Sequence, residues 1–215
     1  MESKERILDA AERLFAEKGF AASSLRMITA AAGVNLAAVN YHFGSKEGLL
    51  QAVFARRLGP LNQSRLEMLD ACEAASGHGG PALEKILEAF LAPPLRMFRP
   101  AALARLMGRI YLEPGETARR ILHEQLGRVA RRFTIALKWA LPELPAAELF
   151  WRMHFTVGVM AHTLAGTLPL EVISGGLCDP SDTEGALERM IAFVAAGLRA
   201  PAPAKRNRRA QRKQT

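Results

Sequence analysis

The chain has 215 residues, of which 49% are hydrophobic, 23% charged and only 7% aromatic. This composition suits a folded protein of one or two domains, and the scarcity of alternating β-branched and aromatic residues predicts an all-α fold. The net charge is +8, but six basic residues without an acid lie in the last sixteen positions, which leaves +2 for residues 1–199. The charge alone therefore does not make the folded part a nucleic-acid-binding protein.

Neither a secreted nor a membrane protein is indicated. Cys72 and Cys178 stand far apart and match no metal or redox spacing, which favours a reducing compartment and no disulfide. The charged start, M-E-S-K-E-R, is unlike a signal peptide. The most apolar run, Phe155 to Leu170, is shorter than the ~20 residues of a membrane span. We expect a cytoplasmic protein without membrane contact.

Nothing in the sequence points to catalysis. It has no H-E-x-x-H zinc motif, nucleophile elbow, Walker loop or paired-carboxylate pattern. His154 and His162 are eight residues apart, too far for one metal ion. We therefore expect no enzyme, no cofactor and no metal site.

The first residues predict two short helices. A periodic apolar stripe predicts a helix from about Lys4 to Lys18, with Ser3 as its N-cap. A second helix is expected to open at Ser24. Arg26 and Thr29 should then lie on its outer side, where a phosphate or a groove edge would be met.

The segment from Gly33 to Lys46, G-V-N-L-A-A-V-N-Y-H-F-G-S-K, predicts a turn, a short helix and the start of the next helix. Gly33 suits a left-handed helix end, and Asn35 is a strong N-cap type. The residues expected to face a core recur at helical spacing: Leu36, Val39 and Phe43. The outer face is left with two methyls, an amide and a phenol: Ala37, Ala38, Asn40 and Tyr41.

Such an uncharged outer face suits a helix pressed into a DNA groove. Asn pairs bidentately with adenine, Ala approaches a thymine methyl, and Tyr reaches a phosphate. Lys beside the free N–H groups of a helix start is a phosphate grip. The candidate DNA contacts are Ser24, Arg26, Thr29, Asn35, Ala37, Ala38, Asn40, Tyr41, His42 and Lys46. The alternatives are an incidental exposed pair at 40–41, a His42 that fills a helix junction, and solvated charges at Arg26 and Lys46.

The remaining chain reads as a helical body followed by a tail. A long helix over 46–75 is expected to kink or break briefly at Pro60, and Pro93-Pro94 is expected to end the next helix. The periodicity predicts further helices over 82–91, 100–111, 116–141, 144–168 and 181–199, with a loop over 169–180. We expect a helix-turn-helix DNA-binding domain over 1–47, a helical effector-binding and dimerisation domain over 48–199, and a disordered basic tail over 200–215.

The last two long helices contain many small residues beside large apolar ones, a pattern that lets helices pack closely. A two-fold axis there would give a homodimer, which a palindromic operator requires. The basic tail could add nonspecific attraction to DNA, or be an ordinary solvated terminus.

With these residues in view, the pattern G-V-x-x-x-x-V-x-Y-H-F-x-S-K-x-x-L over Gly33 to Leu49 resembles the TetR family of one-component regulators. The resemblance implies a homodimer, DNA contacts from the second and third helices and the start of the fourth, and a C-terminal helical domain. That domain would bind a small effector that releases the protein from DNA.

A narrower resemblance links segments 33–46, 52–60 and 142–158 to the PsrA-type branch of fatty-acid-responsive regulators of lipid-degradation genes. Residues 61–141 contain no stretch that extends it. An arginine could pair with the carboxylate or phosphates of such an effector. The candidate effector-binding residues are Arg105, Arg109, Tyr111, Trp151, His154 and Phe155. The alternative is that these arginines are surface charges and these aromatic residues belong to the core.

The resemblance thus implies a repressor released from a palindromic operator by a long-chain fatty acid or acyl-CoA. Three other functions remain open: a sensor of another hydrophobic compound such as a drug, a nonspecific nucleic-acid-binding protein driven by the tail, and a helical carrier or enzyme with a vestigial N-terminal module.

Overall fold

The computed structural model describes residues 2–97, 116–165 and 170–203. Its helices are α1 Ser3–Ala22, α2 Leu25–Ala32, α3 Leu36–Phe43, α4 Lys46–Ala75, α5 Leu83–Met97, α7 Glu116–Ala140, α8 Ala146–Ala165, α9 Leu170–Ile173 and α10 Thr183–Arg199, with a 3₁₀ turn at Gly77–Gly79. No strand occurs in these ranges, so the all-α prediction is confirmed.

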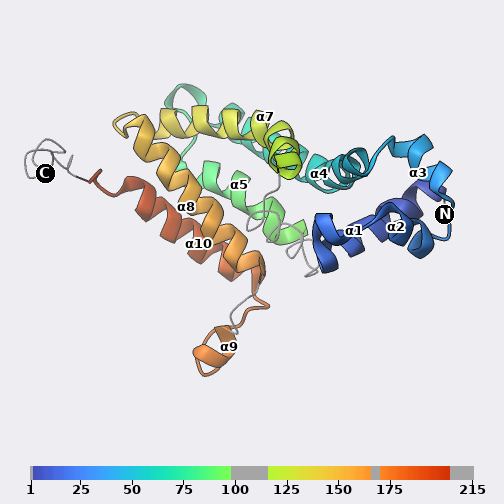
Figure 1. Ribbon diagram of the computed structural model, residues 1–215. Helices are drawn as coiled ribbons and strands as arrows, with labels where there is room; N and C mark the ends of the chain where they lie inside the picture. Colours follow the sequence, from blue (N-terminus) through green and yellow to red (C-terminus); the bar gives the residue numbers. More distant parts are fainter. Residues whose placement is uncertain (1, 98–115, 166–169, 204–215) are drawn as a thin grey trace, which may run out of the picture.

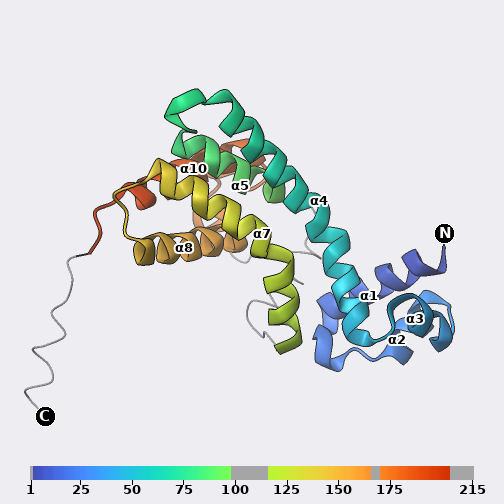
Figure 2. The same ribbon diagram turned by 90° about the horizontal axis from the view of Figure 1, so that it is seen from above.

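The helices form a small N-terminal unit and a larger body joined by one long helix. Figure 1 shows α1, α2 and α3 at one end and α5, α7, α8 and α10 gathered at the other. Figure 2 shows α4 running from the small unit to the body, with α7 beside it. A helix-turn-helix unit therefore stands at the tip of a helical arm.

The N-terminal unit has its own hydrophobic core, which we call the N-terminal cluster. Its central residues come from α1, α2, α3 and the first half of α4: Ile7, Ala11, Phe15, Ile28, Val39, Leu49, Val53 and Phe54. The cluster continues along α4 to Leu61 and also includes Ile121 from α7. The domain boundary expected at residue 47 stays a prediction, but the core crosses that point into α4.

The body has a second core, the C-terminal cluster, built from the inner faces of α4, α5, α7, α8 and α10. Two ion pairs join the ends of α5 to those of α10. Arg199 Nη2 donates to Glu84 at 3.0 Å, and Arg96 donates to both oxygens of Glu184 at 2.8 and 2.7 Å. These pairs lie at the surface and align the two helices around the buried core.

The helix end expected at Pro93-Pro94 was wrong, because α5 continues through both prolines to Met97. The helix α4 runs through Pro60 without the brief break that was one expectation there, and the alternative, a kink, stays a prediction. A proline removes one helical hydrogen bond, at a cost of about 3 kcal/mol in an exposed helix. In α5 both prolines are buried among apolar neighbours, and this packing offsets the lost bond.

Other expectations met mixed outcomes. Helices over 116–141 and 181–199 are confirmed, with Asp182 as the N-cap of α10 through a 2.8 Å bond from Gly185 N–H. The expected loop over 169–180 contains the short helix α9. The helix expected over 100–111 and tail residues 204–215 lie outside the described residues.

Cys72 and Cys178 are both free thiols, as expected. Within the described ranges, no helix combines the length and the hydropathy of a membrane span.

Candidate nucleic-acid interface

Local cap chemistry fixes the ends of α2 and α3. Gly33 ends α2 in the left-handed conformation (φ 62°), and its N–H group bonds to the Ala30 carbonyl. The Asn35 side chain accepts a 2.9 Å bond from Ala38 N–H, and Ser24 accepts one of 3.2 Å from Met27 N–H. The predicted helix-turn-helix geometry at these positions is confirmed. Ser24 and Asn35 are exposed helix caps at the outer edge of the unit.

Helix α3 buries one side and presents the other to solvent. Val39 is fully buried, whereas Tyr41 is 86% exposed. The exposed residues of this outer face are Ala37, Asn40 and Tyr41, which we call the reading surface. Ala38 is half-buried against the N-terminal cluster.

The expected inward orientation of Leu36 is wrong, because its side chain is 43% exposed. Phe43 is half-buried and packs against the N-terminal cluster. An eight-residue helix seats one fully buried side chain, Val39, at its centre, and its first turn projects beyond the core.

Thr29 was expected on the outer side of α2, but its side chain is buried. Its side chain is 7% exposed, and its hydroxyl donates a 3.0 Å hydrogen bond to the Arg26 carbonyl of its own helix. Arg26 is exposed, as expected. Of this pair, only Arg26 is free to meet an approaching phosphate.

His42 and Lys46 are turned toward α1. The His42 Nε2 atom lies 3.0 Å from the Ser3 hydroxyl, so Ser3 joins α1 to α3 and is not the helix cap that was expected. The Lys46 ammonium donates to the Ala21 carbonyl at 3.4 Å and lies 4.3 Å from the centre of the Phe20 ring. Burial lowers the pKa of Lys46, and Glu47 opposes the shift. Both side chains hold the unit together at the rim of the reading surface.

An ion-pair cluster, which the sequence reading missed, fixes α1 to α4. Arg57 Nε donates to both oxygens of Glu12 at 3.0 and 2.9 Å, and Glu12 also accepts from Arg56. Arg56 further donates to Asp9 at 2.8 Å and to Glu5 at 3.2 Å. Burial would lower the pKa of Arg56, but the bonds to Glu12 and Asp9 raise it above its usual value. The sequence signal for this cluster is the helical spacing of Glu5, Asp9 and Glu12, which puts the three carboxylates on one face of α1.

The site therefore consists of a small helix-turn-helix unit with an uncharged outer face, attached rigidly to a long helix. Two family models match this chain: "Bacterial regulatory proteins, tetR family" over residues 7–53, and "Tetracyclin repressor-like, C-terminal domain" over residues 88–197. The chain belongs to the TetR family. TetR regulators bind DNA and act as dimers, and their C-terminal domains take small-molecule ligands. This chain is accordingly a DNA-binding transcriptional regulator and not an enzyme.

Curated relatives resemble only part of this TetR protein. The regulator SrpR from Pseudomonas putida is 43% identical over 60 residues, which are 28% of this chain and 28% of SrpR. The regulator YerO from Bacillus subtilis strain 168 is 49% identical over 49 residues, which are 23% of this chain and 17% of YerO. Each match spans less than a third of the relative's own length.

Solved structures resemble nearly the whole chain in fold. The fatty acid degradation regulator FadR from Bacillus halodurans aligns with a TM-score of 0.64 at 16% identity, over 94% of this chain and 98% of that one. FadR from Bacillus subtilis, solved in complex with stearoyl-CoA, aligns with a TM-score of 0.67 at 16% identity, over 90% of this chain and 98% of that one. At identities this low, the structural similarity shows a shared fold and nothing more.

The candidate effector residues have divided outcomes. Arg105, Arg109 and Tyr111 lie outside the described residues. Trp151, His154 and Phe155 are brought together on α8, with ring centroids 5.9 to 6.1 Å apart. All three are exposed on the outer face of this TetR body, and none lines either of the two cavities described below. A role of these three residues in effector binding stays a prediction.

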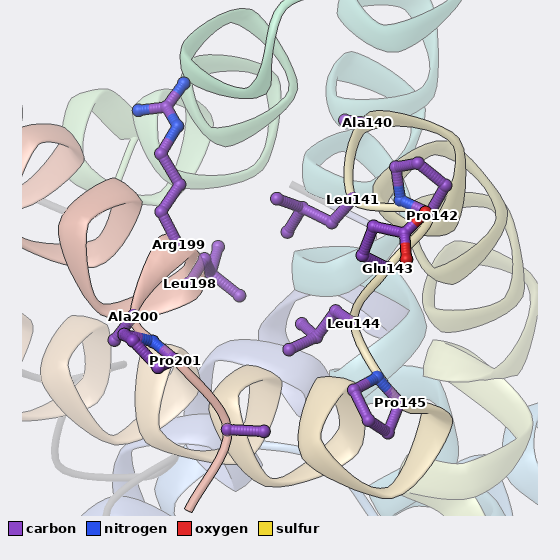
Figure 3. Close-up of a pocket in the computed structure, with 11 residues that line it drawn as sticks. Ala140, Leu141, Pro142, Glu143, Leu144, Pro145, Leu198, Arg199, Ala200 and Pro201 are labelled. Atoms are coloured by element: carbon purple, nitrogen blue, oxygen red, sulfur yellow. The ribbon is translucent and has the colours of Figure 1, made fainter.

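One cavity, of about 390 Å³, lies between the α7–α8 turn and the C-terminal end of α10 (Figure 3). Its lining is mainly apolar, with Leu141, Leu144 and Leu198 pointing inward. Beside it, the buried Arg152 donates hydrogen bonds to the carbonyls of Leu198 and Ala200 at 2.8 and 2.6 Å. Arg152 therefore fixes the end of α10 and one wall of this cavity.

A second cavity, of about 320 Å³, lies where the start of α4 meets α7. Ser45 and Gln51 line it from α4 and the preceding turn, and Arg120 and Glu124 line it from α7. Ile121, between these two, is 2% exposed because it inserts into the N-terminal cluster. The DNA-binding unit of this TetR protein is thus connected to the body through both α4 and α7.

Proposed function

We propose that this protein is a dimeric repressor in which α3 of each subunit reads one half of a palindromic operator in the major groove. The reading surface carries the proposal, because Ala37, Asn40 and Tyr41 are exposed on one uncharged face. Asn40 is suited to an adenine edge and Ala37 to a thymine methyl, while Tyr41 and the exposed Arg26 are suited to phosphates. Ser24, Asn35, Ala38, Thr29, His42 and Lys46 position this surface.

The α3 helices of the two subunits, the recognition helices, must be held at a fixed separation. An exposed face of α8 and α10 supports dimerisation through these two helices. This dimer face contains Trp151 and Phe155 on α8 and Phe193 on α10, all well exposed. Gly158 follows Phe155 by three positions and Gly197 follows Phe193 by four, a spacing that puts each on the same side of its helix, and an added Cβ at either would meet open space. Aromatic anchors flanked by small residues suit a close, self-complementary contact of two copies.

For the effector we propose a long-chain fatty acid or its coenzyme A thioester, with lipid-degradation genes under control. The support is the sequence resemblance to a fatty-acid-responsive branch and the fold shared with FadR of Bacillus subtilis, which was solved with stearoyl-CoA. Arg105, Arg109 and Tyr111 remain the candidate effector residues. A ligand that fits the body best when the recognition helices are misplaced would shift the population away from the DNA-bound state.

The shift would reach the DNA through the two connections already described. Helix α4 supplies about a third of the buried residues of the N-terminal cluster, and Ile121 of α7 lies within it. Cores are close-packed, so a displacement of α7 against α4 cannot be absorbed locally and must move the helix-turn-helix unit.

A titration tests both parts of the proposal. The protein first selects its operator from a random DNA pool, and the labelled operator is then followed by fluorescence anisotropy. Oleoyl-CoA or oleate should release the operator, whereas acetyl-CoA should not. Unchanged affinity with both long-chain compounds would reject the effector assignment, and release by rhodamine 6G alone would favour a drug sensor.

A tail variant separates specific from nonspecific binding. A protein that ends at Ala200 lacks the basic tail but keeps the reading surface. A repressor of the proposed kind should retain its preference for the selected palindrome over a scrambled duplex. Loss of that preference would support a nonspecific nucleic-acid-binding protein.

A further inference from the structure

The segment 170–178, which we call the apolar arm, projects beyond the ends of α8 and α10 (Figure 1). It begins with the one-turn helix α9, none of whose residues is buried. Its aliphatic side chains face solvent, with Val172 74% and Leu177 90% exposed, and Leu170 and Ile173 are also exposed. Glu171 is its one charged residue. None of these aliphatic residues belongs to either hydrophobic cluster.

The arm nevertheless has a defined conformation. The N–H group of Gly176 donates to the Glu171 carbonyl at 2.8 Å, and Cys178 N–H donates to the Ser174 hydroxyl at 3.0 Å. Gly175 and Gly176 adopt positive φ angles of 61° and 84°, which close the turn. An ordered turn that displays four aliphatic side chains exposes apolar surface that a partner would remove from water.

We infer that the apolar arm of one subunit packs on the partner subunit beside the partner's dimer face. This inference rests on the proposed dimer of α8 and α10 and adds an element to it. The arm lies between α8 and α10 in the chain and projects beyond the ends of these two helices, which form the proposed dimer face. The dimer face supplies exposed aromatic rings, and the arm supplies aliphatic side chains of complementary chemistry.

Two-fold symmetry makes a second copy the best-suited occupant. In a self-complementary contact each copy provides both an arm and a face, so both arms are covered at once. The arm's single charge argues against a nucleic acid or an anionic membrane surface, which both require basic residues. Burial of Val172, Ile173 and Leu177 against the partner would increase the apolar area of the interface and strengthen the dimer.

A proximity experiment tests the inference directly. The variant Cys72→Ser leaves Cys178, at the end of the arm, as the single thiol to carry a benzophenone maleimide. Mixed dimers of ¹⁵N-labelled and unlabelled protein are irradiated, and cross-linked peptides are identified by mass spectrometry. We expect peptides that join the arm of one isotope to α8 or α10 of the other. Cross-links confined to one isotope, in a sample that sediments as a dimer, would overturn the inference and leave the proposed function intact.

A variant pair adds an energetic test. Val172→Asp combined with Ile173→Asp should weaken dimerisation about tenfold or more in sedimentation equilibrium. Glu171→Gln, at the neighbouring exposed position, is the matched control and should have no effect. Since α9 contributes no buried residue, circular dichroism should report an unchanged fold. Wild-type dimerisation of the double variant would overturn the inference, and a wild-type protein that is monomeric would overturn the proposed dimer as well.

Discussion

Two exposed helical faces in this protein, the reading surface on α3 and the dimer face on α8 and α10, lack the Lys and Glu residues of an ordinary solvated helix. They differ in what replaces the charges. The reading surface carries methyl, amide and phenol groups at Ala37, Asn40 and Tyr41, whereas the dimer face carries large rings such as Trp151 and Phe193. Hydrogen-bonding groups suit base edges, and large rings suit another protein.

The two faces are also supported differently. Helix α3 has eight residues and one fully buried side chain, Val39, so its position depends on caps and on neighbouring helices. Helices α8 and α10, with 20 and 17 residues, bury their inner sides in the C-terminal cluster. The reading surface would recognise DNA through individually placed side chains, so it depends on the neighbouring helices that hold α3 in place. The dimer face would bind through a large apolar area, so it depends on two long helices that are anchored in the core.

The largest effect is expected at the reading surface. The double variant Asn40→Ala, Tyr41→Ala should weaken binding of the selected operator roughly 1,000-fold, because each half-site loses the Asn40 base contact, worth ~1–3 kcal/mol, together with the Tyr41 phosphate contact. Fluorescence anisotropy measures the loss, and Gln63→Ala on an exposed face of α4 is the control. Full affinity in the double variant would show that this face does not read DNA.

The next effect is expected at the dimer face. Phe155→Asp combined with Phe193→Asp should raise the dimer dissociation constant roughly 100-fold, because the loss of each aromatic contact should cost about 1.4 kcal/mol, which is tenfold in affinity. Sedimentation equilibrium measures the change. Glu188→Gln on α10 is an exposed polar control. A double variant that dimerises normally would place the subunit contact elsewhere.

A smaller effect is expected in the support of the reading surface. Glu12→Gln removes the charge that Arg56 and Arg57 share, and should lower the free energy of unfolding by about 2 kcal/mol. Asp9→Asn, which alters a more exposed partner of Arg56, should cost less than about 1 kcal/mol. Urea denaturation compares the two, and equal losses would contradict a central role for Glu12.

The smallest effect is a dependence on acid pH in the body that carries the dimer face. The hydrogen bond from Arg199 lowers the pKa of Glu84 below 4.5, and the bond from Arg96 does the same for Glu184. The stabilisation from each pair is complete above that value and is lost as the pH falls through the lowered pKa. The melting temperature should therefore fall less steeply below pH 4.5 in the Glu84→Gln, Glu184→Gln variant. If the melting temperature falls equally steeply with pH in the wild type and the variant, the two ion pairs contribute nothing to the stability.

Features determined by local chemistry could be predicted from the sequence. The left-handed Gly33 and the cap at Asn35 follow from the residue and its nearest neighbours, and both are confirmed. The wrong expectations concerned burial, which depends on how the helices pack together. Thr29 was expected to point outward but is 7% exposed, and Leu36 was expected to face the core but is 43% exposed.

The dimer face shows a second limit. Helix α8 has two apolar stripes, one with Leu149 and Met153 in the core and one with Trp151 and Phe155 outside it. Periodicity locates both stripes but does not say which one faces the body. The structure places the first stripe in the core and leaves the rings of the second exposed. Pro93 and Pro94 misled for a related reason, because burial outweighed a local rule.

The most direct test of the central claim varies the distance between the two halves of the selected operator. If two copies of the reading surface are held by one two-fold body, inserting about half a helical turn (~5 bp) puts one half-site on the wrong face of the DNA. We predict that affinity then falls to the level of a single half-site, with wild-type affinity for the unmodified operator. Equal affinity for both duplexes would contradict paired reading by α3.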